Sequence, residues 1–262
     1  MQWNPLPIPD QQLAEQLQTE IGVPFEISCL LAQRGIQDYE MAKSFFRPAL
    51  TDLHDPFLML GMREAVNRIK SSLESGEKIM VFGDYDVDGT TAVALVYSFL
   101  IQEHPNCFYY IPDRYQEGYG ISTQGIDHAK IEEVGLIIAL DCGIKAVEKV
   151  DYAQSLGIDF IICDHHLPGE IIPNAAAVLD PKQPNCSYPF KDLCGCGIGF
   201  KLIQALTQEK GGAIHDIIPF MDLVAMAIAA DIVPIIGENR VLTHFGLQQI
   251  QDNPRVGIRY FI

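Results

Sequence analysis

Clustered acidic side chains in this sequence indicate a site for divalent cations. The segment DYDVDG places Asp84, Asp86 and Asp88 within five residues, and DHH at 164–166 places an aspartate before two histidines. Carboxylates this close repel one another and raise one another's pKa values. Bound cations relieve that repulsion, and a carboxylate-rich set with an imidazole suits Mn²⁺ or Mg²⁺ rather than Ca²⁺.

The acids recur where short apolar segments end. The segments 78–84, 107–113, 135–141, 159–164 and 175–180 end in Asp84, Asp113, Asp141, Asp164 and Asp180. Helix-compatible stretches lie between them, so the pattern predicts an α/β fold whose parallel sheet of about five strands is flanked by helices. Ligands of such sheets bind at the carboxyl ends of the strands. Helix capping explains Asp113 and Asp180 equally well, but not the two clusters.

Apolar residues recur at helical spacing near both ends of the chain. Near the N-terminus they do so at 10–22 and 38–48, which predicts a helical N-terminal lead-in over 1–60. After residue 190 the pattern becomes mostly helical again, so the domain over 61–262 is expected to end in a helical C-terminal segment.

Composition limits the class of protein. The chain has 262 residues, of which 48% are hydrophobic and 20% charged, so it is globular rather than disordered. No apolar run approaches the roughly 20 residues of a membrane span, and no signal peptide is apparent. The seven cysteines lack CxxC spacing and are read as reduced thiols of a cytoplasmic protein. The spacing of Cys186, Cys194 and Cys196 does not fit a zinc site.

The net charge of −16 is unusual for a nucleic-acid-binding protein, because such proteins normally present basic surface. Three explanations remain open: a small substrate, metal cations that reverse the charge locally, or basic surface located elsewhere.

Three known motifs compete for DYDVDGTT. An EF-hand loop requires an acid at its twelfth position, where this chain has Leu95, and is rejected. The haloacid-dehalogenase phosphatase signature matches at 86–90 and would make Asp86 a phosphoryl-accepting nucleophile. That interpretation leaves LDCG and DHH unexplained.

The third match accounts for all the clusters together. DYDVDGTTA, LDCG, DHH and AADIVP occur in the order of the four motifs of the DHH phosphoesterase superfamily, which the chain resembles. The segments 28–48, 111–122, 188–202 and 237–247 resemble its single-strand-specific 5′ exonuclease branch. That branch has a second domain and an oligonucleotide-binding domain, for which this sequence shows no counterpart. The resemblance therefore implies a DHH catalytic domain over 61–262, belonging to a fragment or to an unusually short homologue, and weak activity is the most expected of it alone.

The resemblance implies two-metal hydrolysis of a phosphodiester, with two Mn²⁺ or Mg²⁺ ions per site. Asp141 would bridge the ions. Asp231 lies in an apolar helical run and is expected to be a buried acid that needs a metal partner. The expected metal ligands are Asp84, Asp86, Asp88, Asp141, His165 and Asp231.

Further roles follow from the same resemblance. His166 would be a hydrogen-bond donor or general acid, although a core histidine is the alternative, and Asp164 would orient a neighbouring histidine. Gly89 would allow close backbone approach, and a helix opening at Thr90 would attract phosphate. In a loop that otherwise reads as a solvated turn, Arg114 would bind phosphate, and Tyr115 and Tyr119 would stack on bases.

The function expected from this resemblance is 5′–3′ exonuclease activity on single-stranded DNA in DNA repair and recombination. Single-stranded DNA is the expected partner, together with a single-strand-binding protein and a helicase, and no membrane is involved. The alternatives are the phosphatase with Asp86 as nucleophile and a non-catalytic DHH scaffold module.

Overall fold

The computed structural model describes residue 7 and residues 9–260; most of the N-terminal stretch that bears on a signal peptide lies outside this range. The chain divides into two compact units, Met1–Asp52 and Leu53–Ile262. Within the described residues, no helix has the length and apolar character needed to span a membrane.

The first unit is helical, as predicted. Its elements are α1 (Gln11–Ile21), α2 (Phe25–Gln33), α3 (Tyr39–Phe46) and the 3-10 helix η1 (Leu50–Asp52). The side chains of Asp10 and Asp38 accept backbone N–H groups and cap α1 and α3. Leu17, Leu31 and Ala42 bring one buried residue from each of these three helices into a common core.

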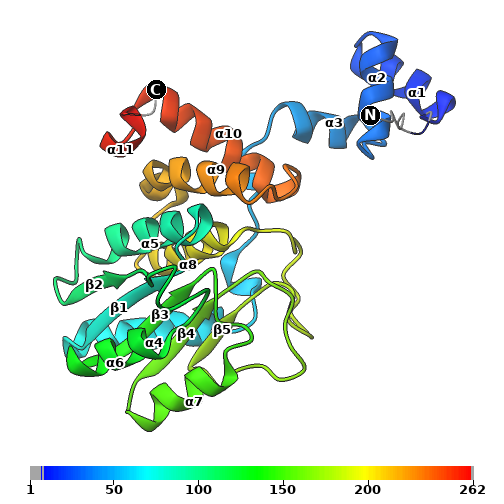
Figure 1. Cartoon of the computed structure of the whole chain (residues 1–262). Helices are drawn as coiled ribbons and strands as arrows, with labels where there is room; N and C mark the ends of the chain where they lie inside the picture. Colours follow the sequence, from blue (N-terminus) through cyan, green and yellow to red (C-terminus); the bar gives the residue numbers. More distant parts are fainter. Residues whose placement is uncertain (1–6, 8, 261–262) are drawn as a thin grey trace. The chain divides into compact units, whose positions relative to one another are not determined.

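The second unit contains the predicted parallel sheet. Its strands are β1 (Lys78–Gly83), β2 (Cys107–Tyr110), β3 (Val134–Leu140), β4 (Asp159–Cys163) and β5 (Ala177–Leu179). They lie in the order β2-β1-β3-β4-β5, and every neighbouring pair is parallel (Figure 1). The order reverses between β1 and β3, which is where open sheets of this type bind their ligands.

Helices cover both faces of the sheet. Helices α4 (Met62–Ser75), α5 (Val87–Leu100) and α8 (Gly195–Glu209) pack on one face, and α6 (Thr123–Ile131) and α7 (Val147–Ser155) on the other (Figure 1). The expected C-terminal helices are α9 (Met221–Ala230), α10 (Gly237–Asp252) and α11 (Val256–Arg259). Helix α9 packs on α5, α8 and α10, and the 3-10 helices η2 (Pro56–Leu58) and η3 (Ile214–Phe220) complete the unit.

The register of the sheet aligns the acids. Gly83 pairs with Leu140, Leu140 with Cys163, and Cys163 with Leu179. Each of these residues directly precedes an aspartate, so four strands deliver an acid at the same level of the carboxyl edge. These acids are Asp84, Asp141, Asp164 and Asp180. The fifth strand differs, since β2 ends at Tyr110 and Asp113 instead caps a turn by accepting the N–H groups of Tyr115 and Gln116.

Helix α5 begins three residues earlier than predicted. Its first residue is Val87 rather than Thr90, because Asp86 is the N-cap and its Oδ1 accepts the Gly89 N–H at 2.9 Å. The sequence alone does not distinguish the two starts, because an aspartate that caps a helix and an aspartate that binds a ligand look the same in it.

Candidate metal centre

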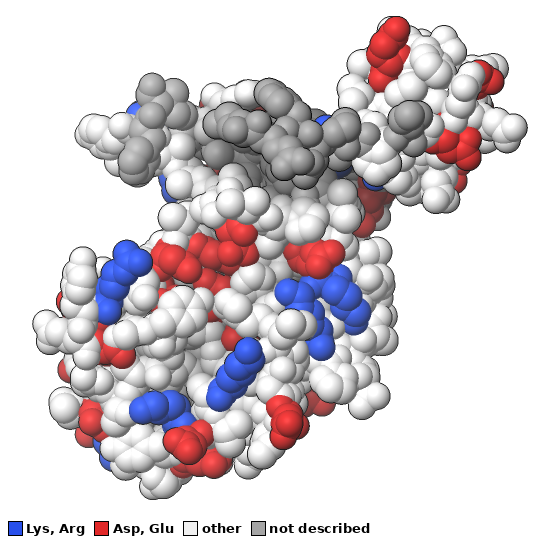
Figure 2. Space-filling view, turned by 45° about the vertical axis from the view of Figure 1, so that its right-hand side comes forward, with Lys and Arg blue, Asp and Glu red and all other residues white. Residues whose placement is uncertain are grey.

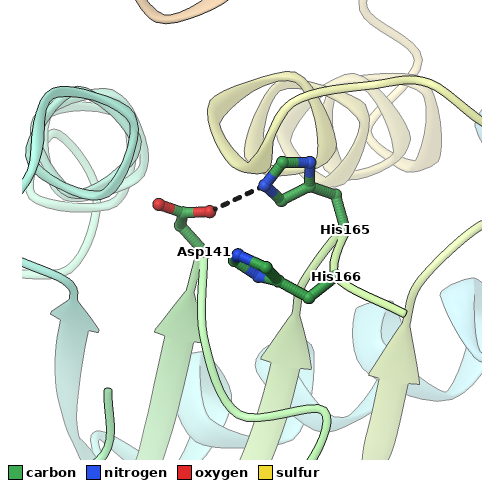
Figure 3. Close-up of side chains that lie close together, drawn as sticks. All are labelled: Asp141, His165 and His166. Atoms are coloured by element: carbon green, nitrogen blue, oxygen red, sulfur yellow. Dashed lines mark ion pairs between the residues drawn. The ribbon is translucent and has the colours of Figure 1, made fainter. Parts of the chain in front are cut away.

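Three carboxylates converge on one imidazole nitrogen at the carboxyl edge of the sheet. His165 Nε2 lies 3.2 Å from Asp141 Oδ1 and 3.7 Å from both Asp88 Oδ2 and Asp231 Oδ2. Asp141 and His165 follow the adjacent strands β3 and β4 and point toward one another (Figure 3). Two overlapping groups have ligand atoms within 4.8 Å of one another: Asp141, His165 and His166, and Asp88, His165 and Asp231.

The backbone at Asp141 turns its side chain into this centre. Its φ of 59° is left-handed, a conformation that aspartate tolerates better than most residues, and its N–H donates to Cys163 O at 2.8 Å. Burial raises the pKa of Asp141 to about 10, and the neighbouring charges of Asp88 and Asp86 act in the same direction. Without a cation, the folded chain therefore favours the neutral form of this acid.

Asp88 has two functions in the structure. It lies in the first turn of α5, and its two carboxylate oxygens accept the N–H groups of Gly195 and Cys196 at 2.6 and 2.7 Å. These are free donors at the N-terminus of α8, so Asp88 joins the two helices while it faces His165. Burial raises the pKa of this acid, although both hydrogen bonds oppose the effect.

Asp164 and His166 form a hydrogen-bonded pair. Asp164 Oδ1 lies 2.7 Å from His166 Nδ1, and the carboxylate also accepts the N–H groups of His165 and Ile144. Burial acts to raise the pKa of Asp164, but the hydrogen bonds outweigh it and the pKa is lowered. The same contact with Asp164 raises the pKa of His166. The pairing leaves His166 Nε2 to face Tyr119 Oη, 3.5 Å away.

Asp231 is exposed, whereas the sequence predicted a buried acid. Its carboxyl group follows the last residue of α9, and the side chain is 34% exposed. Ala229, Ala230 and Ile232 are exposed as well, so the apolar residues around it do not enclose it. The helical pattern could not show that α9 stops at Ala230 and that the chain then leaves the core.

Asp84 and Asp86 lie outside both groups of converging ligand atoms. The buried Asp84 accepts the N–H groups of Tyr85 and Gly120 at 2.7 and 2.9 Å, and burial raises its pKa. Asp86 is exposed and caps α5. Asp86 is nevertheless close enough for its charge to raise the pKa of Asp141. Their assignment as metal ligands stays a prediction.

The predicted substrate-binding residues occupy two places. Gly89 lies against the backbone of Asp84, where a Cβ would be 2.5 Å from its carbonyl oxygen, and the Thr90 hydroxyl donates to Asp86 O and Val87 O within the helix. Gly89 therefore allows the tight turn after β1, and the Thr90 hydroxyl is engaged in the first turn of α5. Arg114 and Tyr119 are exposed at the rim, and the Arg114 guanidinium lies 5.0 Å from the centre of the Tyr85 ring.

Sequence reasoning missed the backbone donors that support the acids. The amides of Gly195, Cys196 and Gly120 hold Asp88 and Asp84. The glycine-rich segments CGCGIG and GYG were available as a signal, because glycine allows close backbone approach. Which carboxylate each segment meets depends on tertiary packing.

The chemistry of the donor set fits divalent cations. Asp141 Oδ1 and His165 Nδ1 are buried and have no hydrogen-bond partner among the described residues. Such atoms are costly unless a ligand satisfies them. Figure 2 shows Asp and Glu side chains gathered on one face of the second unit, with Lys and Arg side chains to both sides. Carboxylate oxygens with an imidazole nitrogen match the preferences of Mn²⁺ and Mg²⁺.

The fold and the donor set define a class of α/β protein, one whose open parallel sheet carries a candidate divalent-cation site at its carboxyl edge. Sequence comparison identifies the family. The profile described as DHH family, N-terminal domain, matches residues 78–228. The chain belongs to this family.

Within this family, the chain is similar to exonucleases named RecJ. The single-stranded-DNA-specific exonuclease RecJ of Bacillus subtilis (strain 168) is 39% identical over 262 residues, which cover 100% of this chain and 32% of that protein. The crystal structure of Thermus thermophilus RecJ with Mn²⁺ matches with a TM-score of 0.80 and 27% identity, over 97% of this chain and 35% of that one. The same protein with Mg²⁺ matches with a TM-score of 0.68 and 25% identity, covering 97% and 32%. The chain thus spans about a third of the length of these relatives.

Proposed function

We propose that this chain carries the catalytic centre of a metal-dependent exonuclease that degrades single-stranded DNA from its 5′ end, in DNA repair and recombination. The observation that carries the proposal is the convergence of Asp88, Asp141 and Asp231 on His165 Nε2. Similarity along the whole chain to relatives named for single-stranded-DNA-specific exonuclease activity supports the substrate. In this proposal residues 61–262 form the catalytic domain and residues 1–60 its helical lead-in.

Two divalent cations, Mn²⁺ or Mg²⁺, would be held by six side chains. Asp88, Asp141, His165 and Asp231 would supply ligands from the converging groups, and Asp84 and Asp86, which follow β1, would supply the others. When bound, they would activate a water molecule and neutralise charge that develops on the phosphate. The protein's own contribution is to keep these acids together at the edge of a rigid sheet. The high pKa of metal-free Asp141 supports this role, because ionising this buried carboxyl group is costly unless a cation lies beside it.

His166 is proposed to act on the scissile phosphate as a hydrogen-bond donor or general acid. Asp164 accepts from Nδ1 at 2.7 Å, which fixes the ring and leaves Nε2 facing Tyr119 Oη. The raised pKa of His166 keeps the imidazole protonated to higher pH, as a donor to a phosphate oxygen requires. Loss of this donor should lower kcat by about 10²–10⁴-fold.

The rim would hold the DNA. Exposed Arg114 offers a planar donor pair to a backbone phosphate, and exposed Tyr119 and Tyr115 offer faces on which bases can stack. The carboxylate of Asp113 is occupied by two turn amides, which leaves Arg114 to reach outward over Tyr85. A single-strand-binding protein and a helicase are the proposed protein partners.

The phosphatase alternative assigns covalent chemistry to Asp86. In the structure Asp86 Oδ1 accepts the Gly89 N–H and caps α5, a task that does not require nucleophilicity. The nuclease proposal predicts that no acyl-phosphate can be trapped on this side chain. The scaffold alternative predicts no metal binding, whereas the grouping of carboxylate and imidazole side chains that could hold a metal ion supports the nuclease proposal.

The test is a nuclease assay with Mn²⁺ on oligonucleotides labelled at the 5′ or the 3′ end, in single-stranded and duplex form. We expect mononucleotides to appear first from the 5′ label of single strands, and Asp141→Asn to lower the rate by at least about 100-fold. Release from the 3′ label first, or cleavage that persists in Asp141→Asn, would contradict the proposal. A longer protein that includes the remaining domains of the relatives is the positive control.

A further inference from the structure

The side chains at the start of the loop that carries Asp231 are exposed and make few contacts that could hold the loop in place. Asp231 is 34% exposed, and its ion-pair partner among the described residues is His165 at 3.7 Å. The next residue, Ile232, is 85% exposed and has a left-handed φ of 58°, which is strained for a β-branched side chain. Such a conformation persists only where the surrounding structure holds it.

A buried polar network lies directly after this loop, in the first turn of α10. Glu238 is 1% exposed; its Oε1 accepts from Lys201 Nζ at 2.8 Å, and its Oε2 accepts from the Tyr188 hydroxyl at 2.6 Å. The carboxylate also accepts the His54 N–H at 3.0 Å, and Lys201 donates to His54 O at 2.8 Å. Both carboxylate oxygens are therefore hydrogen-bonded, which makes the position of Glu238 unusually well determined.

The next residue ties this turn to the loop itself. Asn239 is fully buried, and its Nδ2 donates to Pro234 O at 3.0 Å and to Asp192 O at 2.6 Å. Pro234 belongs to the loop that carries Asp231, and Asp192 lies three residues before α8. Asn239 thus ties the Asp231 loop to the segment that directly precedes α8.

Helix α8 connects the network with the other side of the metal centre. Lys201 lies in the second turn of α8, whose N-terminal amides bind Asp88 at 2.6 and 2.7 Å. Hence α8 holds Asp88 at its start and, through Lys201, holds Glu238 in the first turn of α10, beside the Asn239 that donates to Pro234 O. None of the network residues belongs to the groups of converging ligand atoms.

We propose that Glu238, held by Lys201 and Tyr188, is a positioning residue that fixes the loop 231–236 so that Asp231 faces His165. This inference rests on the proposed metal centre and adds to it the element that places its exposed ligand. A buried ion pair is often no more stable than apolar residues of the same shape, so a role in fixing geometry accounts for its presence better than stability does.

The test removes one hydroxyl from each of two similar networks. Tyr188→Phe deletes a donor to Glu238, and the control Ser72→Ala deletes a donor to Glu77, also at 2.6 Å, in a network at the amino end of the sheet. Mn²⁺ affinity is measured by titration calorimetry, and thermal unfolding is followed in EDTA. We expect Tyr188→Phe to weaken Mn²⁺ binding by roughly tenfold and Ser72→Ala to leave it unchanged, while both lower Tm.

A second pair of variants shows whether the effect passes through Asp231. In an Asp231→Asn background, Tyr188→Phe should cause no further loss of Mn²⁺ affinity, because the ligand that the network places is already gone. Asn239→Ala should reproduce the loss if Tyr188→Phe does not fold.

Two failures are distinguishable. Equal Mn²⁺ affinity of Tyr188→Phe and Ser72→Ala, or an undiminished effect in the Asp231→Asn background, overturns the positioning role alone. If the wild-type chain binds no Mn²⁺, or Asp231→Asn binds it as tightly as wild type, the proposed metal centre fails and this inference fails with it.

Discussion

Gly195 of α8 lies against Asp141 so closely that a Cβ at position 195 would be 2.6 Å from Asp141 Oδ1. The absence of a side chain lets the N-terminus of α8 approach both Asp141 and Asp88, whose carboxylate accepts the Gly195 N–H. The candidate metal centre therefore depends on a glycine whose own side chain takes no part in it.

Gly195→Ala should damage the centre directly. The added methyl group must displace Asp141, so we expect a loss of about 1–3 kcal/mol in the free energy of unfolding and weaker Mn²⁺ binding. Urea unfolding in EDTA and calorimetric titration with Mn²⁺ measure the two effects. Gly257→Ala is the matched control, since a Cβ there meets nothing within 4 Å. A variant at 195 with wild-type Mn²⁺ affinity would show that Asp141 tolerates displacement.

Asp141→Asn should separate stability from metal binding. Burial raises the pKa of Asp141 to about 10, so folding at pH 7 forces a proton onto an acid that is ionised in the unfolded chain. Asparagine removes that cost and also tolerates the left-handed φ of 59°. We expect the metal-free variant to be more stable by about 1–3 kcal/mol and to lose the rise in Tm that Mn²⁺ causes.

Thermal unfolding of wild type and Asp141→Asn, each in EDTA and in excess Mn²⁺, measures both effects. A metal-free variant less stable than wild type would mean that the Asp141 carboxylate contributes hydrogen bonding that outweighs its burial.

The sheet and its acids were predictable because they depend on local pattern. Buried parallel strands produce continuous apolar segments, and the acids that follow them come to one edge whatever the strand order. The register that aligns Asp84 with Asp141 and Asp164 is a consequence of strand pairing and has no signature in the segments themselves.

The exposure of Asp231 and the donors to Asp88 were not predictable in the same way. Both depend on where α9 ends and on which helix terminus faces α5, and these are set by tertiary packing. The apolar composition around 229–232 indicated burial, but the chain leaves the core at this point. Long-range backbone contacts of this kind leave only a weak trace in one sequence, such as the glycines at 195 and 197.

Ile232→Gly should relieve backbone strain beside the metal centre. Ile232 is 85% exposed, so its side chain contributes little burial, whereas its φ of 58° suits glycine. We expect the free energy of unfolding to stay the same or rise by up to about 1 kcal/mol. The comparison is Ile131→Gly at the last residue of α6, 77% exposed, which should lose about 1 kcal/mol. Equal losses in urea unfolding would argue against strain at 232.

Asp180→Asn should change the pH dependence of stability. Asp180 is fully buried at the end of β5, and burial raises its pKa from 3.8 to about 6, although the Lys182 N–H donates to it. Because the folded chain binds this proton more tightly than the unfolded chain, the contribution of Asp180 to stability is complete below about pH 4 and is lost as the pH rises through 6. A pKa difference of about two corresponds to about 3 kcal/mol.

The stability of wild type relative to Asp180→Asn should therefore fall between about pH 4 and pH 6 and change little above about pH 7. Urea unfolding of both proteins in EDTA across this range measures the difference, and carbon NMR of the Asp180 carboxyl group follows its titration directly. Any constant cost of placing an amide at this position cancels in the slope. A difference that does not vary with pH would show that Asp180 remains ionised when the chain folds, and a cation or an additional donor would then have to compensate its charge.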